Sequence, residues 1–436
     1  MFSHYLQLPG TVHLLCLGSF LNRAGSFVLV FLTIYASERL GFGVMFAAFC
    51  GGMIGVGGMI GSLIGGQLAD TWGRRPVMLM ALFGTAAFLI LLSTISNRWL
   101  FLITLGLMTT VADMYRPAAS AMIGDMVREK QRSYAFALMY IAINLGFALA
   151  PPLGGWMAQY DFKWLFYIDA ATTALFGCVI LVGIEDTKAS VGDVVDSDRE
   201  PGAREPDGNA PNALSSAASN VASNASSSAG SEGSMGILPA LGVILADGQF
   251  MLFCLGLFLL QMVFAQGFTT LPLYLVRSGY TELQTGAIVA INGVLIVLLQ
   301  LPVTHWLNNR PAISVMFIGA ILIGFGFCVN AWSTALPIVL LCIVMFTLGE
   351  ILHMPFTNTF VTSLAPAKLR ARYLGVSAWT FALAIAVGSP VGGSLLQYSS
   401  PRVLWVSCGV VSMIAIVLYG IVRSRLLASR PAMAGG

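Results

Sequence analysis

The sequence GQLADTWGRR, residues 66–75, lies between two apolar segments, near residues 44–65 and 77–95. Each flanking segment has the length of about 20 residues that an α-helix needs to cross a hydrocarbon core of about 30 Å. Gly66 and Gly73 permit a tight turn, because glycine adopts backbone conformations that other residues avoid. The stretch therefore predicts a polar turn that joins two membrane-spanning helices.

The rest of the chain repeats this alternation of long apolar segments and short polar ones. Of the 436 residues, 57% are hydrophobic and 9% are charged, and the mean hydropathy is +0.84. A soluble domain carries about 25% charged residues, so the solvent for most of this surface must be lipid. The sequence predicts an all-α integral membrane protein with twelve spans, near residues 11–36, 44–65, 77–95, 99–122, 134–158, 164–184, 250–276, 284–305, 312–332, 336–364, 373–397 and 403–422.

The spans fall into two sets of six, separated by a segment of different composition. Residues 189–235 begin with several Asp and Glu residues and continue as a tract rich in Ala, Ser and Asn. Such a segment cannot bury enough apolar surface to offset the entropy lost on ordering. We therefore expect an N-terminal six-helix bundle over residues 1–188, a flexible linker over 189–235, and a C-terminal six-helix bundle over 236–436.

The distribution of basic residues predicts the orientation in the membrane. Fifteen of the 22 Lys and Arg residues lie on the side that would carry both termini and the linker. Loops rich in Lys and Arg stay in the cytoplasm, so both termini are expected there, in a multi-pass protein of the cytoplasmic (inner) membrane. The first apolar run has no basic residue before it and is interrupted by Asn22 and Arg23, so we interpret it as a retained span rather than a cleaved signal peptide.

The two halves also resemble each other in sequence. Residues 148–160, ALAPPLGGWMAQY, align with residues 386–398, AVGSPVGGSLLQY, and the same offset pairs Pro117 with Pro355. Two six-helix halves in parallel, with a substrate site near the bilayer midplane between them, form a transporter architecture.

Residues 66–75 resemble the signature G-x-x-x-D-x-x-G-R/K, which the major facilitator superfamily carries between spans two and three. The resemblance implies two pseudo-symmetric six-helix bundles and transport by alternating access. It also implies a cytoplasmic gate built from Gly66, Asp70, Gly73 and Arg74, with Asp125 as the expected partner of Arg74. Asp70 is placed to cap the helix that follows, whose N-terminus carries a partial positive charge.

A second resemblance concerns the fifth span. Gly146, Pro151, Gly154 and Gly155 are similar to the pattern G-x-x-x-G-P-x-x-G-G of the drug:proton antiporter branch, with Ala150 in place of one glycine. This implies proton-coupled export of a multidrug type. Proton-coupled uptake or export of a specific metabolite is the alternative within transport, and a membrane receptor on the same fold is the alternative outside it.

Ionisable residues inside the spans are candidates for proton coupling, because each costs about 2.5–3.5 kcal/mol at mid-membrane. Glu350 is the strongest candidate, since a carboxyl at this depth can take up a proton on one side and release it on the other. His353 follows one helical turn later and is a candidate for tuning or relay. Arg23, Asp113 and Arg116 complete the candidate set.

The roles of these charges remain open at this stage. Arg23 can neutralise Asp113 or Glu350, and a static structural pair is an equal alternative. Asp113, close to Arg116, is expected to be mainly structural. Two further acids, Asp169 and Asp247, lie near span ends and are expected to be solvated.

Other classes of function are disfavoured by missing motifs. No lysine follows a glycine, so a phosphate-binding loop of the G-x-x-x-x-G-K type is absent, and neither H-E-x-x-H nor G-x-S-x-G occurs. Glu350 and His353 form only half of a carboxylate metal motif, and the seven cysteines contain no C-x-x-C pair. We expect no enzyme activity, metal, cofactor or nucleic acid. The expected partners are a small-molecule substrate, protons and the lipid bilayer, and the expected state is a monomer.

Overall fold

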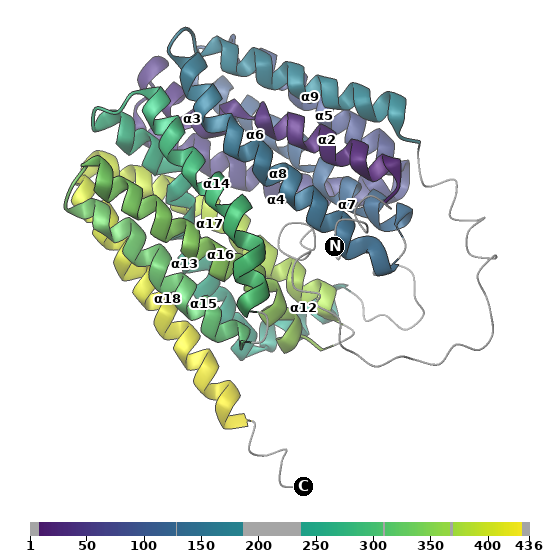
Figure 1. Ribbon diagram of the computed structural model, residues 1–436, viewed down its shortest axis with the longest axis vertical. Helices are drawn as coiled ribbons and strands as arrows, with labels where there is room; N and C mark the ends of the chain where they lie inside the picture. The colour runs from purple at the N-terminus through teal and green to yellow at the C-terminus, as the bar shows by residue number, and fades with distance from the viewer. Residues whose placement is uncertain (1–7, 128, 186–236, 308–309, 367–368, 430–436) are drawn as a thin grey trace.

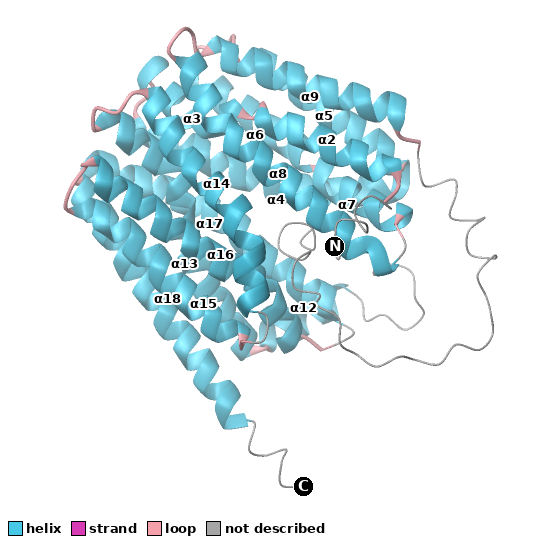
Figure 2. Ribbon diagram, viewed as in Figure 1, coloured by secondary structure: helices cyan, strands magenta, loops and turns pink. Residues whose placement is uncertain are grey.

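The computed structural model describes residues 8–127, 129–185, 237–307, 310–366 and 369–429. Within these ranges the chain is helical and contains no strand (Figure 2). The predicted linker, residues 189–235, lies outside the described residues, and the boundaries of the three predicted domains remain predictions.

The first half begins with a span built from three consecutive helical pieces, α2 (Gly10–Ala24), α3 (Phe27–Ile34) and η1 (Tyr35–Arg39), the last a short π-helix. The other helices of this half are α4 (Val44–Trp72), α5 (Arg74–Leu92), α6 (Arg98–Asp113), α7 (Tyr115–Met126), α8 (Glu129–Ala158) and α9 (Lys163–Gly183).

The second half begins with a short helix, α12 (Ile237–Ala246). It continues with α13 (Gly248–Arg277), α14 (Glu282–Leu307), α15 (Ala312–Cys328), a 3-10 turn η3 (Val329–Ala331), α16 (Leu336–Leu364), α17 (Arg370–Tyr398) and α18 (Pro401–Ser429).

In the described part of the chain, 11 helical segments are long and apolar enough to cross a membrane. They correspond to eleven of the twelve expected spans. The fourth expected span, at 99–122, is divided, because α6 ends at Asp113 and α7 begins at Tyr115. Pro117 explains the break, since its ring would clash with the carbonyl of Asp113 four residues earlier in a continuous helix.

The helices of the two halves pack in the same order, which shows the expected pseudo-symmetry. In each half the first span packs on the fifth (α2 on α8, and α13 on α17), the second on the fourth (α4 on α6, and α14 on α16), and the third on the sixth (α5 on α9, and α15 on α18). Figure 1 shows the purple-to-blue helices and the green-to-yellow helices as two groups that lie side by side.

The closest packing between the halves is that of α4 with α17 and of α8 with α14, and α3 also packs against α13. Glycines bring these backbones together, as small residues do between membrane helices. A Cβ added at Gly52 of α4 would lie 2.7 Å from the carbonyl oxygen of Ala386, and one added at Gly293 of α14 would lie 2.7 Å from Cα of Ala148. The halves therefore touch through backbone-to-backbone contacts that larger side chains would prevent.

The bundle has two ends, which differ in their loops. We call the end where α4 turns into α5 at Gly73 the linker end, because α9 ends and α12 begins there as well (Figure 1). The opposite end carries the loops at residues 40–43 and 278–281, and we call it the distal end.

Candidate functional site

The turn at the linker end depends on one of its two predicted glycines. Gly73 has φ 106° and ψ 159°, a conformation that is essentially restricted to glycine, and it separates α4 from α5. Gly66 instead lies within helix α4, and apart from the adjoining backbone of that helix no atom lies within 4 Å of the position that its Cβ would occupy. The expectation that Gly66 forms the turn is therefore wrong, because α4 continues for six residues beyond it.

Arg74 and Asp125 lie together at the linker end. Nε of Arg74 is 3.0 Å from Oδ2 of Asp125, and both side chains are largely buried. This contact joins the start of α5 to the end of α7, as the resemblance implied. Asp70 is exposed on α4, and no side chain caps the N-terminus of α5, so the expected capping by Asp70 is not observed.

Glu350 lies within α16 and has a neutral partner. Oε2 of Glu350 accepts a hydrogen bond of 2.8 Å from Nδ2 of Asn292, on α14. The same amide nitrogen donates to Oγ1 of Thr347 at 3.1 Å, and Asn292 is almost completely buried. Tyr140 of α8, in the other half, lies close enough to Glu350 to interact with it electrostatically. Glu350 therefore faces the junction between the halves.

No cation neutralises Glu350 within the described ranges. All ion pairs found there involve other acids, and the suggested pair of Arg23 with Glu350 is not formed. A hydrogen bond from an amide stabilises a carboxylate less than a charged partner does. The Glu350 carboxyl is thus free of the kind of contact that would hold it permanently ionised.

His353 faces a different neighbour from Glu350. Its side chain is completely buried, and Nε2 lies 3.1 Å from the hydroxyl of Tyr419 on α18. Nδ1 lies 3.4 Å from the hydroxyl of Thr357. These contacts lead toward α18, whereas the contact of Glu350 leads toward α14, so the structure does not bring the two candidates into direct contact. A relay through His353 stays a prediction.

The remaining charged candidates gather inside the N-terminal half. Nε of Arg116 lies 3.1 Å from Oδ1 of Asp113, and both side chains line a cavity of about 170 Å³ together with Arg23. The fourth charged residue of this cavity is Asp169, which the sequence did not select. Only 6% of Asp169 is exposed, so the expectation that it is solvated is wrong.

Asp247, the other acid expected to be solvated, has a structural role. Its Oδ1 accepts hydrogen bonds from the backbone N–H groups of Gln249 and Phe250 at the start of α13. Its Oδ2 accepts one of 3.0 Å from the hydroxyl of Tyr373. Asp247 is therefore a helix N-cap that also joins α13 to α17, and it is half-buried rather than free in solvent.

The motif of the fifth span packs α8 against both halves. A Cβ at Gly146 would lie 2.6 Å from the carbonyl oxygen of Phe20, and one at Gly154 would lie 2.9 Å from the ring of Phe31. Gly155 faces the other half, where its Cβ would lie 2.9 Å from Cα of Leu283. The carbonyl group of Pro151 lies against Gly286 of α14. These residues serve close helix packing, Gly146 and Gly154 within the first half and Pro151 and Gly155 at the junction.

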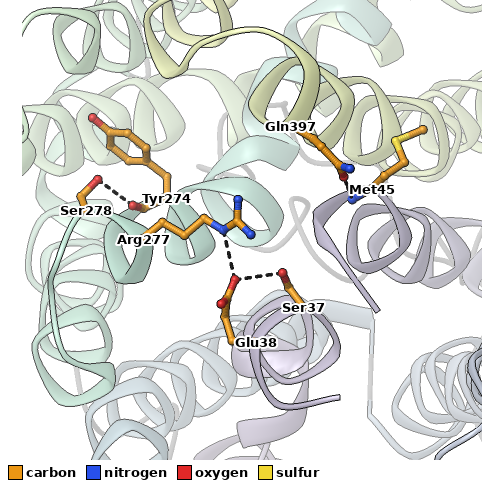
Figure 3. A network of polar contacts seen from close by, with 7 residues as sticks. All are labelled: Ser37, Glu38, Met45, Tyr274, Arg277, Ser278 and Gln397. Atoms are coloured by element: carbon orange, nitrogen blue, oxygen red, sulfur yellow. Dashed lines mark hydrogen bonds and ion pairs between the residues drawn. The ribbon is translucent and has the colours of Figure 1, made fainter. Parts of the chain in front are cut away.

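Two ion pairs connect the halves at the distal end, and the sequence did not reveal them. Nε of Arg277 lies 3.0 Å from Oε1 of Glu38, as Figure 3 shows, and Nη2 of Arg39 lies 3.3 Å from Oε1 of Glu282. Close by, the backbone N–H of Met45 donates to the side-chain oxygen of Gln397 (Figure 3). The available signal was an adjacent acid and base, Glu38 and Arg39, at the end of the first span.

Comparison with known proteins agrees with this architecture. The Major Facilitator Superfamily profile matches residues 15–389. A Na(+), Li(+), K(+)/H(+) antiporter of Planococcus maritimus is 25% identical over 89% of this chain and 88% of its own length. The multidrug resistance protein MdtH of Citrobacter koseri is 22% identical over 82% of this chain and 80% of its own. A peptide transporter POT solved with sulfate has a TM-score of 0.71 at 19% identity, and the match covers 97% of this chain and 95% of that one.

Proposed function

Because this chain belongs to the Major Facilitator Superfamily, we propose that it exports a small molecule in exchange for protons. The relatives and solved structures compared above are transporters and not enzymes. In this proposal the two halves rock about their junction and expose a central site to each side of the membrane in turn. The substrate is a small molecule, and the chain works in the inner membrane of a bacterium, as its bacterial relatives suggest.

The environment of Glu350 is the observation that carries proton coupling. A group that couples transport to a proton gradient must bind and release a proton during the cycle. Asp113 already has a cationic partner, because its Oδ1 lies 3.1 Å from Nε of Arg116. Glu350 has only the neutral amide of Asn292 at 2.8 Å, so either protonation state can be accommodated. Of these two acids, Glu350 is the one suited to exchange its proton.

The position of Glu350 suits this role as well. It lies on α16 next to α14, and Tyr140 of the opposite half is within electrostatic range. Because α8 and α14 form part of the junction, movement of one half past the other alters the surroundings of this carboxyl. A change of surroundings shifts the balance between the neutral and the charged form, which links proton binding to conformation.

The ion pairs at the two ends suggest how the cycle is gated. In the described residues, every ion pair between the halves lies at the distal end, while the Arg74–Asp125 pair at the linker end lies within one half. The structure thus has the halves clamped at the distal end. Opening of that end requires the Glu38–Arg277 and Arg39–Glu282 pairs to separate.

The distribution of basic residues supports the orientation that we propose. The linker end carries most of the Lys and Arg residues in the sequence, which supports a cytoplasmic linker end and an external distal end. The direction of transport is proposed from two relatives whose names state antiport and multidrug resistance. The glycine and proline pattern of α8 supports the same direction.

Transport assays in proteoliposomes test this function and separate it from its alternatives. The purified protein is reconstituted with a panel of lipophilic cations, Na⁺, Li⁺ and K⁺ as trial substrates. Proton-coupled export predicts that, when a pH gradient is imposed, protons move toward the side with the lower proton concentration. The trial substrate moves in the opposite direction, toward the side with the higher proton concentration. Movement in the same direction as protons indicates uptake instead. Binding without any counterflow indicates a receptor and contradicts the proposal.

A further inference from the structure

The first span is interrupted where it passes α9. Helix α2 ends at Ala24 and α3 begins at Phe27, and the backbone N–H of Phe27 donates to the carbonyl of Gly25 at 2.8 Å. A Cβ at Gly25 would lie 2.8 Å from Cβ of Thr172, so only glycine allows α9 to come this close. The break exposes the N-terminus of α3 to side chains of α9.

Asp169 of α9 occupies that exposed N-terminus. Its Oδ2 accepts a hydrogen bond of 3.3 Å from the backbone N–H of Val28, in the first turn of α3. Its Oδ1 accepts one of 3.5 Å from the hydroxyl of Thr173, which itself accepts one of 2.8 Å from Nδ2 of Asn22 on α2. A negative charge is stabilised at the N-terminus of a helix, so the ionised carboxylate holds the two parts of the span to α9.

The cavity lined by Asp169 is smaller than a typical pocket for a drug-sized ligand. Its volume is about 170 Å³, whereas pockets for drug-sized ligands occupy roughly 300–1,000 Å³. One water molecule takes about 30 Å³ in the liquid, so the cavity has room for a few waters. Polar groups of α2, α7 and α9 line it, and water there can carry a proton to or from the carboxyl.

The charges around this cavity balance only when both of its acids are ionised. Arg23, Asp113, Tyr115 and Arg116 are the titratable and charged groups that line it with Asp169. Arg116 is engaged by Asp113, and no ion pair of Asp169 is found in the part of the chain that the structure describes. Protonation of Asp169 therefore leaves two guanidinium groups facing a single carboxylate.

The element that Asp169 holds also carries the distal gate. Helix α3 continues without interruption into η1, and η1 contains Glu38 and Arg39. These residues form the ion pairs with Arg277 and Glu282 that clamp the halves together. A change at the first turn of α3 is thus transmitted along one short helix to the clamp.

We propose that Asp169 is a second proton-binding site of this transporter, and that its protonation opens the distal gate. The inference rests on the proposed proton-coupled function and adds a proton site to Glu350. The proton binds an oxygen of the Asp169 carboxylate from cavity water and returns to water when the gate closes. Binding removes the charge that stabilises the N-terminus of α3 and leaves Arg23 without its balancing charge, so η1 is released from its clamped position.

The distance between labels at the distal end tests the proposal. Ser96 and Ser399 are exposed at that end, one in each half. Both are changed to cysteine and spin-labelled in a background with Cys178→Ser and Cys328→Ser, the two native cysteines that are not buried. Between about pH 8 and about pH 5.5, which stays above the value of about 4 typical of exposed carboxyls, we expect the label distance to increase in the wild type. The distance in Asp169→Asn should be long at both pH values.

Three variants make the result decisive. Asp247→Asn is the matched control, because Asp247 also binds a helix N-terminus but lies outside the cavity, and it should keep the wild-type pH response. Glu350→Gln removes the other proposed proton-binding group, so a pH response that remains in this variant and is lost when Asp169→Asn is added belongs to Asp169. Should Asp169→Asn fail to fold, Thr173→Val removes one of the two donors to the carboxylate and should move the response to higher pH.

Infrared spectroscopy gives an independent readout of the proton itself. The wild type should show C=O absorption of protonated carboxyls that grows as the pH falls, and one component of it should be missing in Asp169→Asn while the component of Glu350 remains. A label distance that does not change with pH, or an unchanged response and band in Asp169→Asn, overturns the proposal. If a component is missing in Asp169→Asn but none is missing in Glu350→Gln, only the function proposed for Glu350 is contradicted.

Discussion

Arg277 at the end of α13 and Glu38 at the end of the first span form an ion pair of 3.0 Å that joins the two halves at the distal end. Arg39, the next residue after Glu38, forms the second pair with Glu282 at 3.3 Å. In one pair the first half supplies the acid, and in the other it supplies the base. The clamp is therefore neutral overall, while each of its contacts is attractive.

Charge reversal of one partner should open this clamp. Glu38→Lys places a cation beside Arg277 and replaces attraction with repulsion. Exposed ion pairs contribute about 0.2–1 kcal/mol, so we expect the ratio of open to closed molecules to rise by roughly 2-fold to 5-fold. The measurement is the distance distribution between spin labels at Ser96→Cys and Ser399→Cys. The double variant Glu38→Lys with Arg277→Glu should restore the wild-type distribution, and a double variant that stays open contradicts the pairing.

The gate at the linker end should depend on Asp70 and on the Arg74–Asp125 pair. Asp70→Asn and Asp125→Asn should each slow transport several-fold and leave substrate binding nearly unchanged, because both residues lie at the linker end, away from the mid-membrane position expected for the substrate site. Transport rates in proteoliposomes are compared with affinities measured on the same preparations. Full activity of Asp70→Asn at equal expression would remove Asp70 from the gate.

The two glycines of residues 66–75 should respond in opposite ways to alanine. Gly73→Ala forces a side chain into a backbone conformation that is essentially reserved for glycine, at a cost of about 1–3 kcal/mol. Gly66→Ala adds a methyl group to open space within α4, where alanine favours the helix by up to about 1 kcal/mol. Thermal unfolding in detergent should show a lower midpoint for Gly73→Ala and an equal or higher one for Gly66→Ala. Equal losses in both variants contradict the assignment of the turn to Gly73.

The amide of Asn292 should set the pH range in which the transporter works. Asn292→Ala removes the donor to Oε2 of Glu350, and a carboxylate that loses a hydrogen bond gives way to its neutral form at higher pH. We expect the pH profile of transport to move to higher pH. Asn330→Ala is the matched control, because Asn330 is also a buried amide of this half but contacts Cys342 instead. An unshifted profile in Asn292→Ala, or an equal shift in Asn330→Ala, contradicts this account.

Hydropathy was sufficient to predict the spans, and the resemblance of residues 66–75 to the family signature predicted the gate contact at the linker end. The apolar segments coincide with the long helices. Arg74 lies directly after the turn at Gly73 and Asp125 lies near the end of α7, and their side chains meet at the linker end. The break at Met114 depends on Pro117, whose effect is local and was readable in principle. A count of apolar residues does not reveal this break, because α6 and α7 together are as long and apolar as one span.

The burial of single charged residues could not be predicted, because it depends on the direction in which a helix face points. Asp169 lies only a few residues into its span, at a depth that suggested contact with water. Its side chain instead points between α9 and the broken first span, where Val28 and Thr173 bind it. His353 follows Glu350 by one turn, yet it contacts Tyr419 rather than the neighbours of Glu350. Sequence spacing gives the position along a helix, but the packing partners decide the contacts.

The most direct test of the account is the behaviour of Glu350→Gln in proteoliposomes, with Asp113→Asn as the matched control. Glutamine cannot exchange a proton, so accumulation of substrate driven by a pH gradient should be abolished. Exchange of labelled for unlabelled substrate needs no net proton movement and should persist. Asp113→Asn should retain gradient-driven transport, although at a lower rate, because its partner Arg116 loses an ion pair. If Glu350→Gln still accumulates substrate under the gradient while Asp113→Asn does not, Asp113 is the proton carrier and the account of Glu350 is wrong.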